Sequence, residues 1–220
     1  MRSFPALRTG LLIAALSLSL AAQTTPAGEP QTESKGLPPR TAPTDYQAHA
    51  QVGTVTLAAE FAGHSVPTME RPFNDDDYVA VEVGLFGPAG ARARISADDF
   101  SLRVNAKKTP LPSRQFALVL SSLKDPEWQP PDEGEKKSKG GISTGGSANG
   151  DPPPTPAHMP FELQRAMELL VKKAALPEGD RALPRAGVLF FNYRGKTTGI
   201  HSLELIYDGP AGKASLTLQP

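Results

Sequence analysis

The feature that most constrains the fold of this chain is the placement of apolar residues at every second position. Four aliphatic residues of segment 78–86 share one face if that segment is extended: Val79, Val81, Val83 and Leu85. Successive side chains of a strand point to opposite faces, so this spacing predicts a β-strand with one face in a core. The pattern recurs in four further segments: 55–61, 100–104, 201–207 and 214–218. Segment 188–193 is apolar nearly throughout, which predicts a central strand buried on both faces.

One α-helix is predicted, over residues 161–176. Six residues at helical spacing form a single, largely apolar stripe: Leu163, Ala166, Met167, Leu170, Val171 and Ala174. We expect this amphipathic helix to pack on the strands; a helix that binds a partner or a membrane surface is the alternative. Segment 114–128 fits either a strand or a short helix. Short strands separated by Gly and Pro turns predict a mainly β protein, a β-sandwich.

The N-terminal residues 1–21 have the pattern of a signal peptide. Arg2 and Arg8 precede an apolar stretch of about a dozen residues that ends in small residues near Ala21. A membrane anchor is the alternative, although the stretch is short for a span of about 20 residues. After signal removal we expect no transmembrane span and an extracytoplasmic location, periplasmic or secreted. The chain contains no cysteine, which excludes disulfides, a thiol nucleophile and a lipid-modified cysteine.

Two segments are too polar and too rich in Pro and Gly to form a core. Residues 22–46 predict a disordered leader, and residues 129–160 predict a long flexible insertion. Neither the strands before the insertion nor those after it can close a core alone, so we expect one domain over 47–220. The 23 basic and 23 acidic residues balance, and this charge favours neither nucleic acid nor anionic lipid as a partner.

The run Asp75–Asp77 is the first candidate site. Adjacent carboxylates can bind a hard cation such as Ca²⁺, with His64 or Glu70 as possible neighbours, but the EF-hand spacing is missing. Asn and Asp also initiate turns, so we expect a solvated turn that leads into the strand at 78. Copper is a further alternative, through His64 with Met69 or His158 with Met159.

The sequence indicates no catalytic chemistry. Residues 141–145 have the letters GxSxG, but they lie in the Gly/Ser-rich segment predicted as an insertion, not on a turn between a strand and a helix, where a nucleophile elbow is found. Ser121 and Lys124 have SxxK spacing, with no catalytic partner implied, and the glycines at 140–146 lack the order of a phosphate-binding loop. We therefore expect a protein that is not an enzyme, with no catalytic, cofactor-binding or metal-ligating residue assigned and no cofactor.

Several segments together resemble a known family. They are the strand at 78–88, the Ser-x-x-Asp-Phe-x-Leu segment at 96–102, the Leu-Pro-rich turn and apolar strand at 176–193, and the terminal hairpin at 203–218. Their combination resembles bacterial extracytoplasmic immunoglobulin-like domains of unknown function, of the secreted antigen or lipoprotein type. The resemblance implies an immunoglobulin-like antiparallel β-sandwich and no catalytic residues.

These expectations point to a functional class. We expect an exported, non-enzymatic interaction or structural module of the cell envelope, with a protein or a glycan of the envelope as its partner. The alternative is a periplasmic protein that binds a metal or a small ligand.

Overall fold

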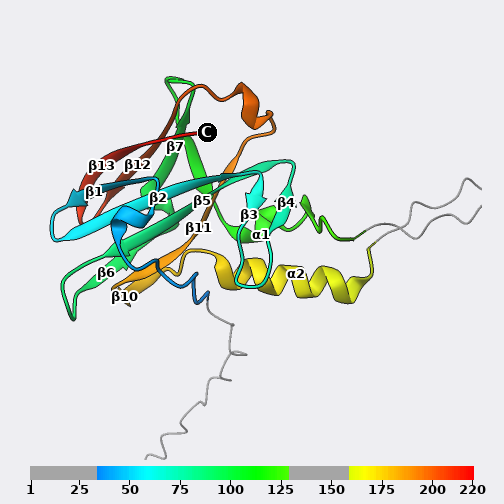
Figure 1. Cartoon of the computed structure of the whole chain (residues 1–220), viewed down its shortest axis with the longest axis horizontal. Helices are drawn as coiled ribbons and strands as arrows, with labels where there is room; N and C mark the ends of the chain where they lie inside the picture. Colours follow the sequence, from blue (N-terminus) through cyan, green and yellow to red (C-terminus); the bar gives the residue numbers. More distant parts are fainter. Residues whose placement is uncertain (1–33, 129–158) are drawn as a thin grey trace, which may run out of the picture. The chain divides into compact units, whose positions relative to one another are not determined.

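The structure, a computed structural model, describes residues 34–128 and 159–220, in which antiparallel strands predominate (Figure 1). In spatial order, the main sheet contains β1 (Ala48–Val52), β2 (Val55–Gly63), β5 (Tyr78–Phe86), β11 (Arg185–Asn192), β8 (Leu111–Arg114), β7 (Phe100–Val104), β12 (Leu203–Gly209) and β13 (Gly212–Leu218). The mainly β prediction is confirmed. The predicted signal peptide, residues 22–33 of the predicted leader and residues 129–158 of the predicted insertion lie outside the described residues.

Smaller elements surround this sheet. Two short sheets contain β3 (Ser65–Val66), β4 (Phe73–Asp75) and β9 (Leu123–Lys124) in one, and β6 (Arg92–Ile95) and β10 (Gly179–Ala182) in the other. The helices are α1 (Phe116–Val119), α2 (Phe161–Ala174) and the 3₁₀ turns η1 (Pro43–Asp45), η2 (Ala97–Asp99) and η3 (Thr197–Gly199). Segment 114–128, which fitted a strand or a helix, contains the end of β8, all of α1 and the short strand β9.

The main sheet has two halves that one short strand joins. Strands β1, β2, β5 and β11 pair along much of their length, as do β7, β12 and β13. Strand β8 pairs with β11 at two positions and with β7 at two. The edge strands β1 and β13 approach each other, and Gln47 Nε2 donates a hydrogen bond of 3.0 Å to the carbonyl oxygen of Gln219. The sheet is therefore nearly closed.

The main core lies between the two halves. The inner face of β5 contributes the four aliphatic residues predicted from the sequence, and β7, β12 and β13 contribute eight buried side chains opposite them: Phe100, Leu102, Val104, Leu203, Leu205, Tyr207, Leu216 and Leu218. The ring of Phe100 packs against that of Tyr207, with 5.0 Å between their centroids. The apolar residues at every second position thus predicted these strands correctly.

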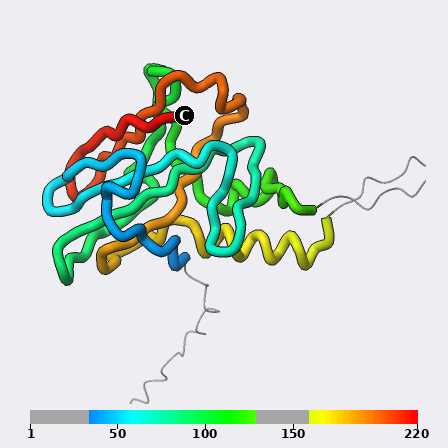
Figure 2. Tube along the Cα trace, in the orientation of Figure 1, coloured from blue at the N-terminus to red at the C-terminus, as the bar shows by residue number. Residues whose placement is uncertain are grey.

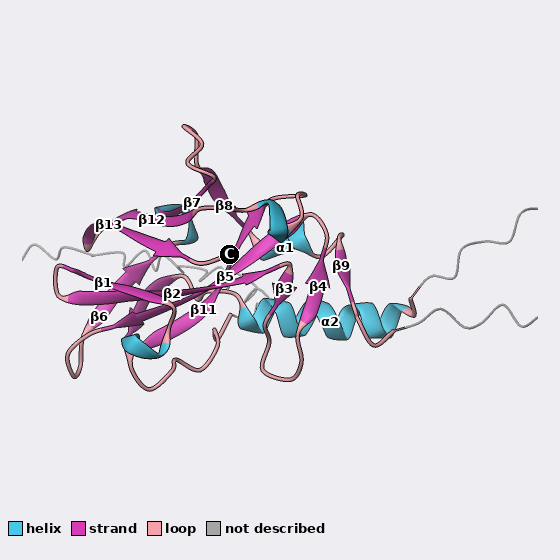
Figure 3. Ribbon diagram, turned by 45° about the horizontal axis from the view of Figure 1, so that its top comes forward, coloured by secondary structure: helices cyan, strands magenta, loops and turns pink. Residues whose placement is uncertain are grey.

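A second core covers the outer face of β5 and β11. Ala80, Val188 and Phe190 point to this side and pack against α2, β3, β4 and β9. Figure 3 shows α2 alongside β3 and β4. Strand β11 is consequently buried on both faces, from Ala186 to Phe191, as its continuous apolar sequence predicted.

Helix α2 begins at the predicted residue and ends two residues early. Met167, Val171 and Ala174 are buried against the sheet, and burial of a Val or Met side chain contributes about 1.5–3 kcal/mol. The helix ends because Ala175 turns extended and forms a bridge with Val188. Within the predicted stripe, Ala166 is exposed. The prediction of a helix that packs on the strands is confirmed.

Residues 34–46 form an ordered strap on the outer side of the sheet, which Figure 2 traces as the dark blue tube that leads into β1. Leu37 forms an antiparallel bridge with Ala186. A Cβ atom on Gly36, whose φ is +77°, would lie 2.0 Å from the Ala186 carbonyl oxygen, so glycine permits this close approach. The prediction of a disordered leader is therefore wrong for residues 34–46.

Charge fixes the strap at a second place. Glu60 and Glu82 stand directly opposite each other on β2 and β5, an arrangement that is unfavourable for like charges. The guanidinium of Arg40 pairs with both: Nη2 lies 3.0 Å from Glu82, and Nη1 contacts Glu60. The same guanidinium lies 4.5 Å above the ring of the buried Tyr46. The strap thus neutralises a like-charge pair that the strands create.

In the part of the chain that the structure describes, neither α1 nor α2 combines the length and the apolarity that crossing a bilayer requires.

Candidate functional site

Asp75 is a buried structural residue at the start of the predicted aspartate turn. Its side chain is fully buried, and its Oδ1 accepts hydrogen bonds of 2.8 Å from the backbone N–H groups of Asp77 and Tyr78. Its Oδ2 accepts a bond of 3.0 Å from the hydroxyl of Ser122. Burial raises the pKa of Asp75, and these three donors offset part of that rise. The turn was predicted correctly, but the prediction that it is solvated is wrong for Asp75.

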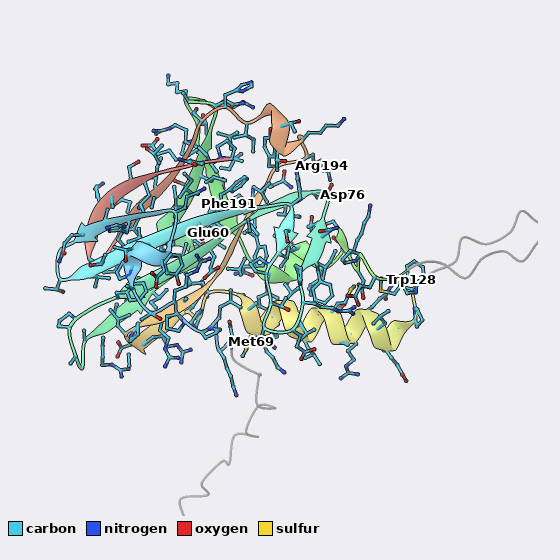
Figure 4. The ribbon with its side chains drawn as sticks, in the orientation of Figure 1. Glu60, Met69, Asp76, Trp128, Phe191 and Arg194 are labelled. Atoms are coloured by element: carbon cyan, nitrogen blue, oxygen red, sulfur yellow. The ribbon has the colours of Figure 1, made fainter. Side chains whose placement is uncertain are left out.

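The other two carboxylates point to separate cations. Asp76 is exposed and pairs with Lys124, whose pKa is raised by this contact. Asp77 lies 2.9 Å from Nη2 of Arg194, and Figure 4 shows Asp76 and Arg194 at the same end of the molecule. Because the three carboxylates have different partners, they do not converge on a common position where a cation could bind.

His64 lies beside the same turn, and both of its ring nitrogens face backbone carbonyl oxygens. Nδ1 is 2.7 Å from the carbonyl oxygen of Asp75 and 2.9 Å from that of Tyr78, while Nε2 is 2.8 Å from that of Gly195. The ring therefore joins the turn before β5 to the loop after β11. A nitrogen that is engaged with a carbonyl is not free to bind copper, and Met69 is an exposed loop residue.

The remaining candidate metal ligands do not lie close together in the described part of the chain. Glu70 is exposed, and so are His49 and His201 on other elements. Across residues 34–128 and 159–220, no three His, Asp or Glu side chains are grouped closely enough to hold an ion. His158, proposed above as a copper ligand with Met159, lies outside the described residues.

A groove of about 440 Å³ at the end of the β7–β8 hairpin is the strongest candidate for a binding site. Its polar lining comes from β7, the hairpin turn, the residues at the start of β12 and the end of β13: Arg103, Lys107, Lys108, Ser202, Glu204 and Thr217. The hairpin turn projects from the sheet in Figures 1 and 3. None of the candidate site residues identified from the sequence belongs to this turn.

Asn105 fixes one wall of this groove to the other. Its Oδ1 accepts hydrogen bonds from the N–H groups of His201 at 2.6 Å and Ser202 at 3.3 Å, and its Nδ2 donates to the carbonyl oxygen of Gly199 at 2.9 Å. Asn105 and Ala106 have φ of 52° and 51°, and Lys107 N–H donates to the carbonyl oxygen of Val104. These values define a tight hairpin turn in which Ala106 has a conformation that favours glycine.

The outer face of β7, β12 and β13 forms the floor of the groove. Arg103, Glu204 and Thr217 are cross-strand neighbours in one row. Glu204 contacts both Arg103 and the hydroxyl of Ser215, so its charge is balanced within the floor. Lys107 and Lys108 are exposed at the rim, and in the described part of the chain their ammonium groups have no partner. The groove therefore carries excess positive charge.

Comparison with protein-family models, with curated proteins and with solved structures found no match for this chain.

Proposed function

We propose that this chain is an exported, non-enzymatic binding module of the cell envelope that contacts an envelope protein or glycan through the groove at the β7–β8 hairpin. The observation that carries the proposal is the pair Lys107 and Lys108, which have no partner within residues 34–128 and 159–220 and lie beside a concave surface that Asn105 holds in shape. Export rests on the signal-peptide pattern at residues 1–21.

The chemistry of the groove favours binding over catalysis. Among the described residues that line it, Glu204 is the carboxylate, and both of its oxygens are engaged, one with Arg103 and one with Ser215. A general base needs an acceptor that is free to take a proton from its substrate. The lysine and hydroxyl groups act as donors, which suits the recognition of a ligand rich in acceptor oxygens.

We also propose that the two halves of the main sheet are the layers of an immunoglobulin-like β-sandwich. Support comes from the large core between the halves and from the brief pairing of β8 with each neighbour. An experimental structure in which β8 pairs along its whole length with both neighbours would instead define one continuous barrel.

Affinity capture tests the binding function. The purified protein is immobilised and exposed to solubilised envelope of the organism that produces it; bound proteins are identified by mass spectrometry and bound glycans by sugar analysis. The control column carries the double substitution Lys107→Ala and Lys108→Ala. We expect a protein or glycan to be retained by the native protein and depleted on the control. Retention of nothing by the native protein would refute the proposed function.

A further inference from the structure

We propose that the groove binds an oxyanion, a phosphate or a carboxylate, carried on a ligand of about the size of a sugar. This inference rests on the proposed function and specifies the class of ligand. Its basis is the combination of uncompensated charge, unpaired hydroxyls and a fixed wall within one groove.

The charge of the groove selects the sign of the ligand. Arg103 and Glu204 neutralise each other on the floor, which leaves the ammonium groups of Lys107 and Lys108 uncompensated. Both belong to a turn whose backbone is fixed, so their Cα atoms are held at the rim although their side chains are exposed. A lysine ammonium donates up to three hydrogen bonds to an anion.

Two hydroxyls supply neutral donors next to these cations. Ser202, which directly precedes β12, and Thr217, on β13, both line the groove. Among residues 34–128 and 159–220, neither hydroxyl has a hydrogen-bond partner. Ammonium groups beside free hydroxyls match a ligand that combines an anionic group with further oxygen atoms, such as a sugar phosphate or a uronic acid.

The turn itself is held in a costly conformation. Ala106 lines the groove at φ 51°, in a region that non-glycine residues seldom adopt and that often occurs at functional sites. The hydrogen bonds of Asn105 to segment 199–202 hold the wall in place before a ligand arrives. A site formed in advance spends less of its binding energy on ordering its own residues. The volume of about 440 Å³ is within the usual range for small-molecule sites.

Nuclear magnetic resonance titration of the full, purified protein tests this assignment. The probes are glucose 6-phosphate and glucuronate, which separate phosphate from carboxylate, with glucose as the neutral probe and inorganic phosphate as the bare anion. We expect one or both charged sugars to shift the backbone amide signals of residues 105–108 and 202–204, and glucose to leave them unchanged. Binding should weaken as salt rises, because exposed charges are screened over about 8 Å at physiological ionic strength.

Two double variants isolate the groove. Lys107→Ala with Lys108→Ala should weaken binding of the charged sugar roughly tenfold, since two exposed ionic contacts are lost. Lys172→Ala with Lys173→Ala removes the same charge from neighbouring lysines on α2 and should leave the affinity unchanged. An equal loss in both variants would overturn the assignment, because it would reflect net charge alone.

Failure of the titration and failure of the capture experiment are distinct results. Absence of shifts at 105–108 with either charged sugar up to about 10 mM, a concentration that detects even very weak binding, would overturn the oxyanion assignment. If the native protein still retained an envelope partner, the binding function would stand through another chemistry. Shifts with inorganic phosphate that equal those with glucose 6-phosphate would contradict the requirement for a sugar-sized ligand.

Discussion

Substitution of Asp75 separates the effect of a buried charge from the effect of its hydrogen bonds. Asp75→Asn keeps an oxygen that can accept from the N–H groups of Asp77 and Tyr78, and its amide can donate to the hydroxyl of Ser122. Asp75→Ala removes the acceptor of the Asp77 and Tyr78 N–H groups at a fully buried position, while the Ser122 hydroxyl can still donate to the carbonyl oxygen of Val119. We therefore expect the two variants to differ sharply in stability.

The magnitude follows from the number of donors. A buried donor left unpaired costs about 1–3 kcal/mol, so with two donors affected Asp75→Ala should lower the free energy of unfolding by about 2–6 kcal/mol. Asp75→Asn should remain within about 1 kcal/mol of the native protein at neutral pH, since its hydrogen bonds are replaced one for one. Urea denaturation followed by far-ultraviolet circular dichroism measures both differences.

The dependence on pH gives a second, independent check. Burial raises the pKa of Asp75 above the ordinary value for an aspartate, so the folded state holds this proton more tightly than the unfolded chain does. The contribution of Asp75 to stability is therefore fully present below the unfolded value and is lost as pH rises through the folded pKa. Asparagine does not titrate, so Asp75→Asn should gain stability relative to the native protein as pH rises. A relative loss over that range, or an Asp75→Ala variant within about 1 kcal/mol of the native protein, would refute this account.

Three further substitutions test other parts of the structure. Ala106→Gly should stabilise the protein by about 0.5 kcal/mol, measured by thermal denaturation, because relief of the left-handed strain exceeds the added entropy of the unfolded chain; destabilisation would contradict the strain. Arg40→Ala should cost about 2–3 kcal/mol in urea denaturation, because two ion pairs are lost and Glu60 then faces Glu82 without compensation; adding Glu60→Gln should recover part of it, and no recovery would exclude the repulsion. His64→Ala should cost about 2–3 kcal/mol for three lost carbonyl contacts, and hydrogen exchange should accelerate in the loop after β11 while the core amides of β5 remain protected; uniform acceleration would argue against a local role.

The spacing of apolar residues along the sequence was sufficient to predict the main strands. Segment 78–86 is a strand over its predicted length because its side-chain period of two matches one buried face. Within the apolar run at 188–193, residues 188–191 are buried on both faces, as an unbroken apolar sequence predicts. The strap at 34–46 was missed because its composition is that of a disordered segment. Its order comes from contacts with distant strands: Leu37 bridges Ala186. Arg40 pairs with Glu60 and Glu82, and composition does not reveal such contacts.

The groove shows why the candidate site was harder to predict than the strands around it. Two adjacent lysines in a turn are ordinary surface residues when they are considered from the sequence alone. They become a candidate site because β12 pairs with β7 and places Ser202 and Glu204 beside them. Strand periodicity determines which residues face outward and leaves open which strands become neighbours.

Asn105 is the residue through which the site could have been suspected, because a side chain with one acceptor and two donors can satisfy a neighbouring loop as well as start a turn. In this protein Asn105 does both, and the groove exists because the two loops are held together at that residue.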